Sequence, residues 1–198
     1  MPFSSAEGKG FFEDWLFHMM VPGHITTIFD VGAGCGSYYE LAKNCANAAE
    51  QYRPNIKKDM VINGSEIHAP YISHFKLEEK YNSIMNTDIR EVAQDLDPHD
   101  LFIFGDVLEH LTKDEAIDVL SKIKKKSRFI WLSIPTKACR PWSNEYNQHE
   151  DEWTKSGNPN EQHLHMWDIE ELGFCFGPFT GLCVFPVVTV AMIEGDIK

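Results

Sequence analysis

The stretch of greatest chemical interest is FDVGAGCG, residues 29–36. Three glycines stand there at alternate positions, Gly32, Gly34 and Gly36, and Asp30 precedes them at the end of an apolar run. A glycine-rich turn between a strand and a helix lets a ligand approach the backbone closely. We therefore expect a small-molecule site at this turn. The spacing of the glycines and the acid indicate which ligand it takes.

The glycine spacing argues against a dinucleotide. The dinucleotide fingerprint is G-x-G-x-x-G, but the third required position here is Ser37 when counted from Gly32, and Tyr39 when counted from Gly34. Asp30 would also repel a pyrophosphate. The ligand that fits is nucleoside-like, carries no phosphate and bears positive charge. S-adenosylmethionine meets these conditions, with its sulfonium, α-ammonium, ribose and adenine.

Residues 25–135 resemble the class I S-adenosylmethionine-dependent methyltransferases. Two motifs carry the resemblance: DVGAGCG, and DVLEHL at residues 106–111, which is similar to the fourth-strand motif of a branch that methylates small molecules and some RNAs. The resemblance implies that S-adenosylmethionine is the cofactor and S-adenosylhomocysteine the product. It also implies a first cofactor motif made of Asp30, Gly32, Ala33, Gly34 and Gly36.

The same resemblance implies roles for acids at the ends of three later strands. Glu66 would bind both ribose hydroxyls, since a carboxylate can accept two hydrogen bonds at once. Asp88 would meet the adenine amino group, although it could also be only the N-cap of the next helix. Asp106 would lie beside the methyl donor. Their sequence neighbours are expected to line the same site: Ile67, Ile89 and Val107.

Catalysis need not leave a strong signature in the sequence. Methyl transfer from a sulfonium is an in-line displacement, so alignment can supply much of the rate. A general base is needed only where the acceptor must lose a proton. The candidates are Glu109 and His110, which follow the fourth strand; the alternative for His110 is a purely structural role. Because no strong base is evident, a non-catalytic S-adenosylmethionine-binding module with a regulatory role stays an alternative.

A long polar segment at residues 136–164 has no clear period and is expected to be a substrate-side loop. Trp142 and Tyr146, with Trp153, could form an aromatic wall around a small acceptor or anchor the loop to the core. His163 and His165 are further candidates for contact with the substrate, as is His149; the alternative is a polar loop that crosses the surface.

A metal site is a further possibility at these residues. Asp106, Glu109 and His110 could share a divalent cation with His163 or His165. Such a site is similar to that of small-RNA 2′-O-methyltransferases, which use two glutamates and two histidines. Asp106 replaces the first glutamate here and is needed for the cofactor. We therefore expect no metal and keep metal-assisted RNA 2′-O-methylation as an alternative function.

Short apolar runs alternate with amphipathic ones and predict the elements that position these residues. Strands are expected at 26–32, 59–67, 82–89, 100–108 and 127–135, and helices at 38–52, 68–81, 90–96, 112–126 and 165–174. Two further strands should follow in the tail. The order predicts an α/β, Rossmann-like doubly wound, mostly parallel seven-stranded sheet with an antiparallel C-terminal edge hairpin. Ligands bind such sheets at the carboxyl ends of the strands, where the strand order reverses.

The composition indicates one domain over residues 1–198, with 43% hydrophobic residues. The net charge of −12 disfavours a large nucleic-acid footprint. DNA base methylation is disfavoured because GDVLEH replaces the Pro-Pro loop of those enzymes. The acceptor is expected to be a small molecule or an exposed group.

The remaining features of the chain suggest where it works. Five cysteines without CxxC spacing, no apparent signal peptide and no span-length apolar run predict a cytoplasmic protein with no membrane association. Residues 1–25 could form a lid over the cofactor or a helix packed on the sheet.

Overall fold

A single seven-stranded sheet organises the chain. The computed structural model describes residues 6–139 and 158–198. The strand order is β3-β2-β1-β4-β5-β7-β6, with the first five strands parallel and β7 antiparallel to both neighbours. The strands are β1 (Thr27–Val31), β2 (Val61–Ser65), β3 (Ser83–Met85), β4 (His99–Gly105), β5 (Ser127–Ile134), β6 (Phe179–Val184) and β7 (Thr189–Glu194). The predicted fold class is confirmed, including the antiparallel C-terminal hairpin.

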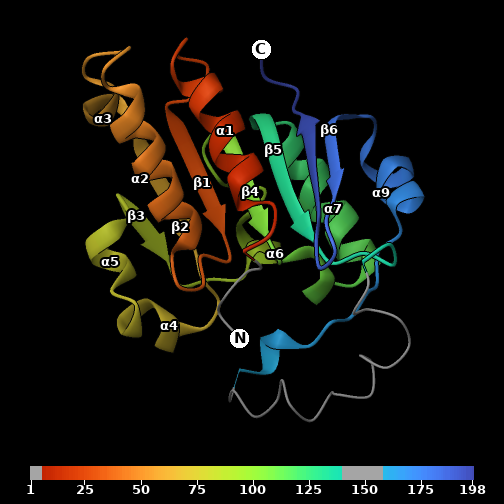
Figure 1. Cartoon of the computed structure of the whole chain (residues 1–198). Coiled ribbons are helices and arrows are strands. Elements are labelled where there is room, and N and C mark those ends of the chain that lie inside the picture. Colours follow the sequence, from red (N-terminus) through yellow and green to blue (C-terminus); the bar gives the residue numbers. More distant parts are fainter. Residues whose placement is uncertain (1–5, 140–157) are drawn as a thin grey trace.

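Helices cover both faces of the sheet (Figure 1). They are α1 (Lys9–Met20), α2 (Ser37–Ala49), α3 (Ile56–Asp59), α4 (Ala69–His74), α5 (Leu77–Lys80), α6 (Ile89–Val92), α7 (Lys113–Lys124) and α9 (Ile169–Phe176), with 3₁₀ turns η1 (Leu108–His110) and η5 (Pro159–Glu161). Helices α1 and α2 pack on one face around Trp131, and α7 and α9 pack on the other around Trp167. The apolar core is therefore split into two layers, as expected of a buried parallel sheet.

Helix α1 packs on the sheet. Its side chains Phe12, Leu16 and Met20 are fully buried, and the rings of Phe12 and Trp131 lie 4.9 Å apart. Of the two roles considered for residues 1–25, the described part of that segment therefore fits the packed helix. Across residues 6–139 and 158–198, no helix is long and apolar enough to cross a membrane.

Two of the predicted helices, at 68–81 and 165–174, differ clearly from the structure. The predicted helix at 68–81 is broken into α4 and α5, because Lys76 adopts a left-handed backbone with φ 53°. Helix α9 starts later than predicted and continues past Gly173 to Phe176, so that glycine does not end it. The helix predicted at 112–126 is α7, which begins after a capping box between Thr112 and Glu115.

The carboxyl ends of the parallel strands meet at one edge of the sheet (the lower edge in Figure 1). Strand β1 pairs with β2 on one side and with β4 on the other, so the chain direction of the crossovers reverses between β1 and β4. This is the switch point at which ligands bind in such folds. The segment 158–165, which we call the strap, lies beyond this edge.

Candidate functional site

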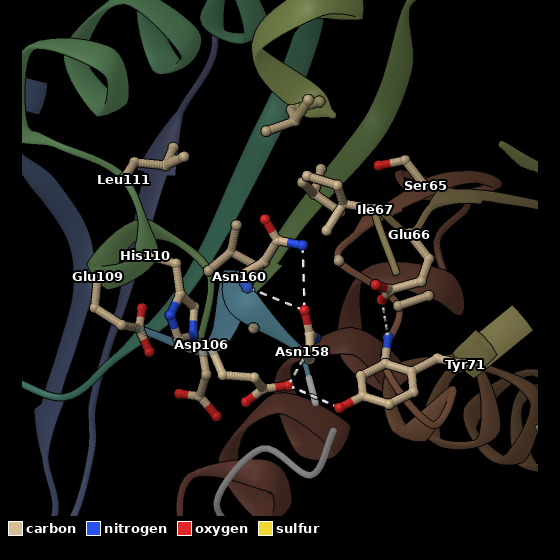
Figure 2. Close-up of a pocket in the computed structure, with 18 of the residues that line it drawn as sticks. Ser65, Glu66, Ile67, Tyr71, Asp106, Glu109, His110, Leu111, Asn158 and Asn160 are labelled. Atoms are coloured by element: carbon tan, nitrogen blue, oxygen red, sulfur yellow. Dashed lines mark hydrogen bonds between the residues drawn. The ribbon is translucent and has the colours of Figure 1, made fainter. Parts of the chain in front are cut away.

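A cavity of about 480 Å³ opens at the carboxyl ends of β1, β2 and β4, a volume within the ordinary range for small-molecule sites. Its walls are the glycine loop, the residues that follow β2, the start of α6, the turn after β4 and the strap. Figure 2 shows Glu66 and Tyr71 on one side of it and Asp106, Glu109 and His110 on the other.

The glycine loop uses conformations that other residues adopt only at a cost. Gly32, Gly34 and Gly36 have φ values of 66°, 54° and 80°, all in the left-handed region. A Cβ on Gly32 would also come within 2.8 Å of the Val107 side chain. The loop is fixed to β2 by the Ala33 amide, which donates to the Ser65 carbonyl at 3.0 Å. This brings backbone close to the space where a ligand would lie.

Glu66 directly follows β2 and is held by two backbone amides. Its Oε2 accepts from the Gly34 amide and its Oε1 from the His68 amide, each at 2.8 Å. Burial raises the pKa of Glu66 and the two amides oppose that rise. Each carboxylate oxygen keeps a further lone pair. Asn86 fixes the same turn by donating to the Glu66 carbonyl at 2.8 Å.

Asp30 lies behind the glycine loop and does not line the cavity. It is 2% exposed and accepts from the Tyr81 hydroxyl at 2.5 Å. Burial raises the pKa of Asp30 to about 7, although the Tyr81 hydrogen bond works against it. The sequence placed this acid against the ligand; the structure shows it buried one layer further in.

Asp88 caps helix α6. Its Oδ1 accepts from the Arg90 amide at 2.9 Å, and its Oδ2 pairs with the Arg90 guanidinium. Arg90 also contacts Glu115 at 2.7 Å. The capping role that the sequence left open is therefore present, and Asp88 still lines the cavity together with Ile89. Ile67 and Val107 line it too.

Asp106 ends β4 in a left-handed conformation, with φ 55°. Its amide donates to the Ser133 carbonyl at 2.8 Å, and the Ser133 hydroxyl is 3.4 Å from its Oδ1. Non-glycine residues in this region cluster at functional sites. The turn aims the chain from the sheet edge into η1, which carries Glu109 and His110.

Glu109 and His110 lie on the cavity wall opposite Glu66 (Figure 2). Glu109 is 2% exposed, and burial, followed by the nearby Asp106, raises its pKa well above the usual range. Burial lowers the pKa of His110, which leaves the imidazole neutral near pH 7. Both candidate bases predicted from the sequence therefore line the cavity.

The strap closes one side of the cavity. The Tyr71 hydroxyl donates to Glu161 Oε1 at 3.0 Å, and the Asn158 amide group donates to the same oxygen at 3.2 Å. At the other side, the Leu164 amide donates to the Glu109 carbonyl at 2.7 Å. The strap thus connects α4 with η1 across the cavity.

The two histidines of the strap differ in position. His163 lines the cavity, 4.9 Å from His110 between ring centroids, and its pKa is lowered to about 4 by burial and then by His110. His165 instead contacts Glu171 at 3.1 Å and does not line the cavity. Trp142, Tyr146, His149 and Trp153 lie outside the described residues.

The wall residues that were not singled out from the sequence include Tyr71, Asn158 and Glu161. Asn158 precedes Pro159 and caps η5 by accepting from the Asn160 amide at 3.0 Å, so the Asn-Pro pair is a local signal that could have been used. Tyr71 and Glu161 are separated by 90 residues, and no local pattern connects them.

The cavity is acidic. Its described wall carries five carboxyl groups: Glu66, Asp88, Asp106, Glu109 and Glu161. Among the described residues that line it, Arg90 is the one lysine or arginine, and it is paired with Asp88 and Glu115. Such a wall attracts a cationic ligand and disfavours a pyrophosphate.

The chain resembles known proteins in its fold. No family model and no curated protein match the sequence. Solved structures do match: magnesium protoporphyrin IX methyltransferase from Synechocystis PCC 6803 with bound SAH has a TM-score of 0.63 at 17% identity, covering 96% of this chain and 83% of that one. The chain has the fold of S-adenosylmethionine-dependent methyltransferases.

Two further structures share this methyltransferase fold. The N-methyltransferase NodS from Bradyrhizobium japonicum WM9, in complex with S-adenosyl-L-homocysteine, has a TM-score of 0.60 at 10% identity, covering 95% of this chain and 87% of that one. An O-methyltransferase family protein from Burkholderia thailandensis has a TM-score of 0.59 at 12% identity, covering 94% and 56%. At these identities the likeness concerns the fold.

Proposed function

We propose that the protein is a methyltransferase that uses S-adenosylmethionine to methylate an O or N atom of a small molecule or exposed group. The observation that carries this proposal is the Glu66 carboxylate, held by the amides of Gly34 and His68 on the wall of an acidic cavity. It has acceptor capacity left for two ribose hydroxyls, at the switch point of a methyltransferase fold.

Different parts of the cavity wall suit different parts of the cofactor and the acceptor. The ribose would lie against Glu66 and the adenine beside Asp88 and Ile89, while the sulfonium would approach the glycine loop near Asp106. An acceptor would then lie between the methyl group and the wall formed by Glu109 and His110. Either of these could take a proton from the acceptor as the methyl group is transferred in line.

The neighbours in the comparisons support this proposal without naming the acceptor. Structures that share the fold were solved with S-adenosylmethionine or S-adenosylhomocysteine bound. An O-methyltransferase family protein and an N-methyltransferase are both among the neighbours. The acidic wall favours a cationic or neutral acceptor over an RNA backbone.

Calorimetric titration tests the cofactor half of the proposal. The wild-type protein should bind S-adenosylhomocysteine in a one-to-one complex with a dissociation constant in the micromolar range, and should not bind NAD⁺. Glu66→Gln removes a charged acceptor, which is worth about 1.5–3 kcal/mol, and should weaken binding roughly tenfold or more. Gly34→Trp should abolish binding, because it fills the approach to the loop.

Glu50→Gln is the matched control. Glu50 follows α2 and pairs with Lys57 at 2.7 Å, with a side chain that is 45% exposed. It should leave the affinity for S-adenosylhomocysteine unchanged. Absence of binding at millimolar S-adenosylhomocysteine, or equally tight binding of NAD⁺, would refute the proposed function.

A further inference from the structure

Three side chains of types that can bind metals lie close together on the cavity wall where the acceptor would lie. Glu109, His110 and His163 each offer one ligand atom, and these atoms all lie within 4.8 Å of one another. Two of the residues belong to η1 and the third to the strap. The hydrogen bond from the Leu164 amide to the Glu109 carbonyl, 2.7 Å long, holds the two segments together. The cluster therefore does not depend on a single flexible loop.

Glu109 gives a second, independent indication of a ligand. Its Oε2 is buried and has no hydrogen-bond partner among the described residues, and the residue is only 2% exposed. Buried carboxylates are normally paired, hydrogen-bonded or bound to a metal, because an isolated one is costly. The free oxygen of Glu109 is thus a binding position that the described part of the chain does not fill.

His110 is oriented as a ligand would be. Its Nδ1 lies 3.1 Å from the Gln162 carbonyl oxygen, which can only accept, so Nδ1 carries the proton. The neutral ring then has its lone pair on Nε2, which is available to a cation. Metal-binding histidines typically donate their other ring N–H to a carbonyl or carboxylate in this way.

We propose that Glu109, His110 and His163 bind one divalent cation on the acceptor side of the cavity. Two imidazoles and one carboxylate are a common donor set for Zn²⁺ and other first-row divalent ions with open coordination positions. Ligand bonds of about 2.1 Å place the donors of a tetrahedral site roughly 3.4 Å apart. Donor atoms that lie within 4.8 Å of one another therefore need to close in by up to about 1.4 Å. From the sequence we expect no metal and keep a site that includes Asp106 only as an alternative; the cluster proposed here does not use Asp106.

The role of this cation rests on the proposed function. Its open positions would receive an oxygen of the acceptor, and a cation lowers the pKa of a bound hydroxyl. With the cation bound, Glu109 and His110 would be its ligands in place of acting as the base, so the hydroxyl proton would leave to water. The C–O bond would form as the C–S bond of the sulfonium breaks, and S-adenosylhomocysteine would be the product. The acceptor class is then a hydroxyl compound with room to bind the cation.

Titration with Zn²⁺ and Mn²⁺ after chelator treatment tests the site directly. The wild-type protein should bind one equivalent of at least one of the two ions with a dissociation constant in the micromolar range or below. His163→Ala and Glu109→Gln should each weaken that binding at least tenfold. His165→Ala is the matched control, because it changes a histidine of the same strap that contacts Glu171 instead of the cluster.

The outcomes separate this proposal from the proposed function. No binding of either ion at millimolar concentration, or equal binding by wild type, His163→Ala and Glu109→Gln, would overturn the cation site. S-adenosylhomocysteine titration of the same samples reports on the methyltransferase function by itself, and its retention shows that each variant is folded. If the ion binds as expected and S-adenosylhomocysteine does not, the site stands and the proposed function fails.

Discussion

Two aspartates on neighbouring parallel strands illustrate how surroundings decide the effect of a carboxyl group. Asp30 of β1 is fully buried with one hydroxyl partner, and its pKa is raised to about 7. Asp100 of β4 would also have its pKa raised by burial, but hydrogen bonds from Thr26 and Thr27 lower it overall. The two groups should therefore affect stability in opposite directions as the pH changes.

The wild-type protein should lose stability as the pH rises toward 7, because Asp30 is buried with a raised pKa. Asp30→Asn should remove this loss. Because the pKa of Asp30 is raised on folding, its contribution is fully present below about pH 4 and is lost as the pH rises through about 7. The free energy of unfolding of the variant relative to wild type should therefore rise between pH 4 and 8. One pKa unit is worth about 1.36 kcal/mol, so the rise should be at most on the order of 4 kcal/mol by urea denaturation.

Asp100→Asn is the control of opposite sign. A lowered pKa stabilises the fold above the unfolded value, and the stability is lost as the pH falls through the folded value. The variant should therefore lose about 1–3 kcal/mol at pH 7 and less at pH 3. Parallel pH profiles for Asp30→Asn and Asp100→Asn would show that the assigned environments are wrong.

At the scale of elements, a long-range hydrogen bond joins the strap to α4. Tyr71→Phe removes the hydroxyl that donates to Glu161 and leaves the ring in place. Amides of residues 158–165 should then exchange faster with deuterated solvent, and stability should fall by about 1 kcal/mol.

Tyr52→Phe provides the comparison for this variant, since Tyr52 is 63% exposed. In Tyr52→Phe, the amides of residues 158–165 should exchange with deuterated solvent as fast as in the wild type. Unchanged exchange in Tyr71→Phe as well would mean that this hydrogen bond does not hold the strap.

A second element-scale prediction concerns the contact between β4 and α2. A Cβ on Gly105 would meet the Tyr38 ring at 2.1 Å, so Gly105→Ala must displace a buried aromatic side chain next to Asp106. We expect a loss of about 1–3 kcal/mol and weaker cofactor binding.

Gly10→Ala tests the same change where there is space. Among the described residues, no atom outside the backbone of its own helix lies within 4 Å of a Cβ at Gly10. Gly10 is in the first turn of α1, and alanine favours a helix by up to about 1 kcal/mol over glycine. Thermal melting should show stabilisation of this variant and destabilisation of Gly105→Ala. The reverse order would contradict the packing described for β4 and α2.

For the whole molecule, the sequence predicts the sheet and one side of the cavity well. Apolar runs and amphipathic runs alternate strongly, so the mostly parallel sheet, its C-terminal hairpin and the shared carboxyl edge follow from general rules of chain connection. Glu66 and Asp106 come directly after β2 and β4, and Asp88 follows the end of β3 by three residues. This local position is enough to place them at the edge.

The other side of the cavity depends on contacts that have no local pattern. Tyr71 and Glu161 are 90 residues apart in sequence, and the strap shows no helical or strand period. The burial of Asp30 also depends on Tyr81, 51 residues further along the chain. Such positions are fixed by packing of the whole fold, which periodicity does not reveal.

The central claim is that this cavity binds S-adenosylmethionine with its ribose on Glu66. A crystal structure of the protein with S-adenosylhomocysteine tests it most directly. We predict both ribose hydroxyls within hydrogen-bonding distance of the Glu66 carboxylate, and the sulfur atom between the glycine loop and Asp106. S-adenosylhomocysteine bound elsewhere, or with its ribose away from Glu66, would contradict the account.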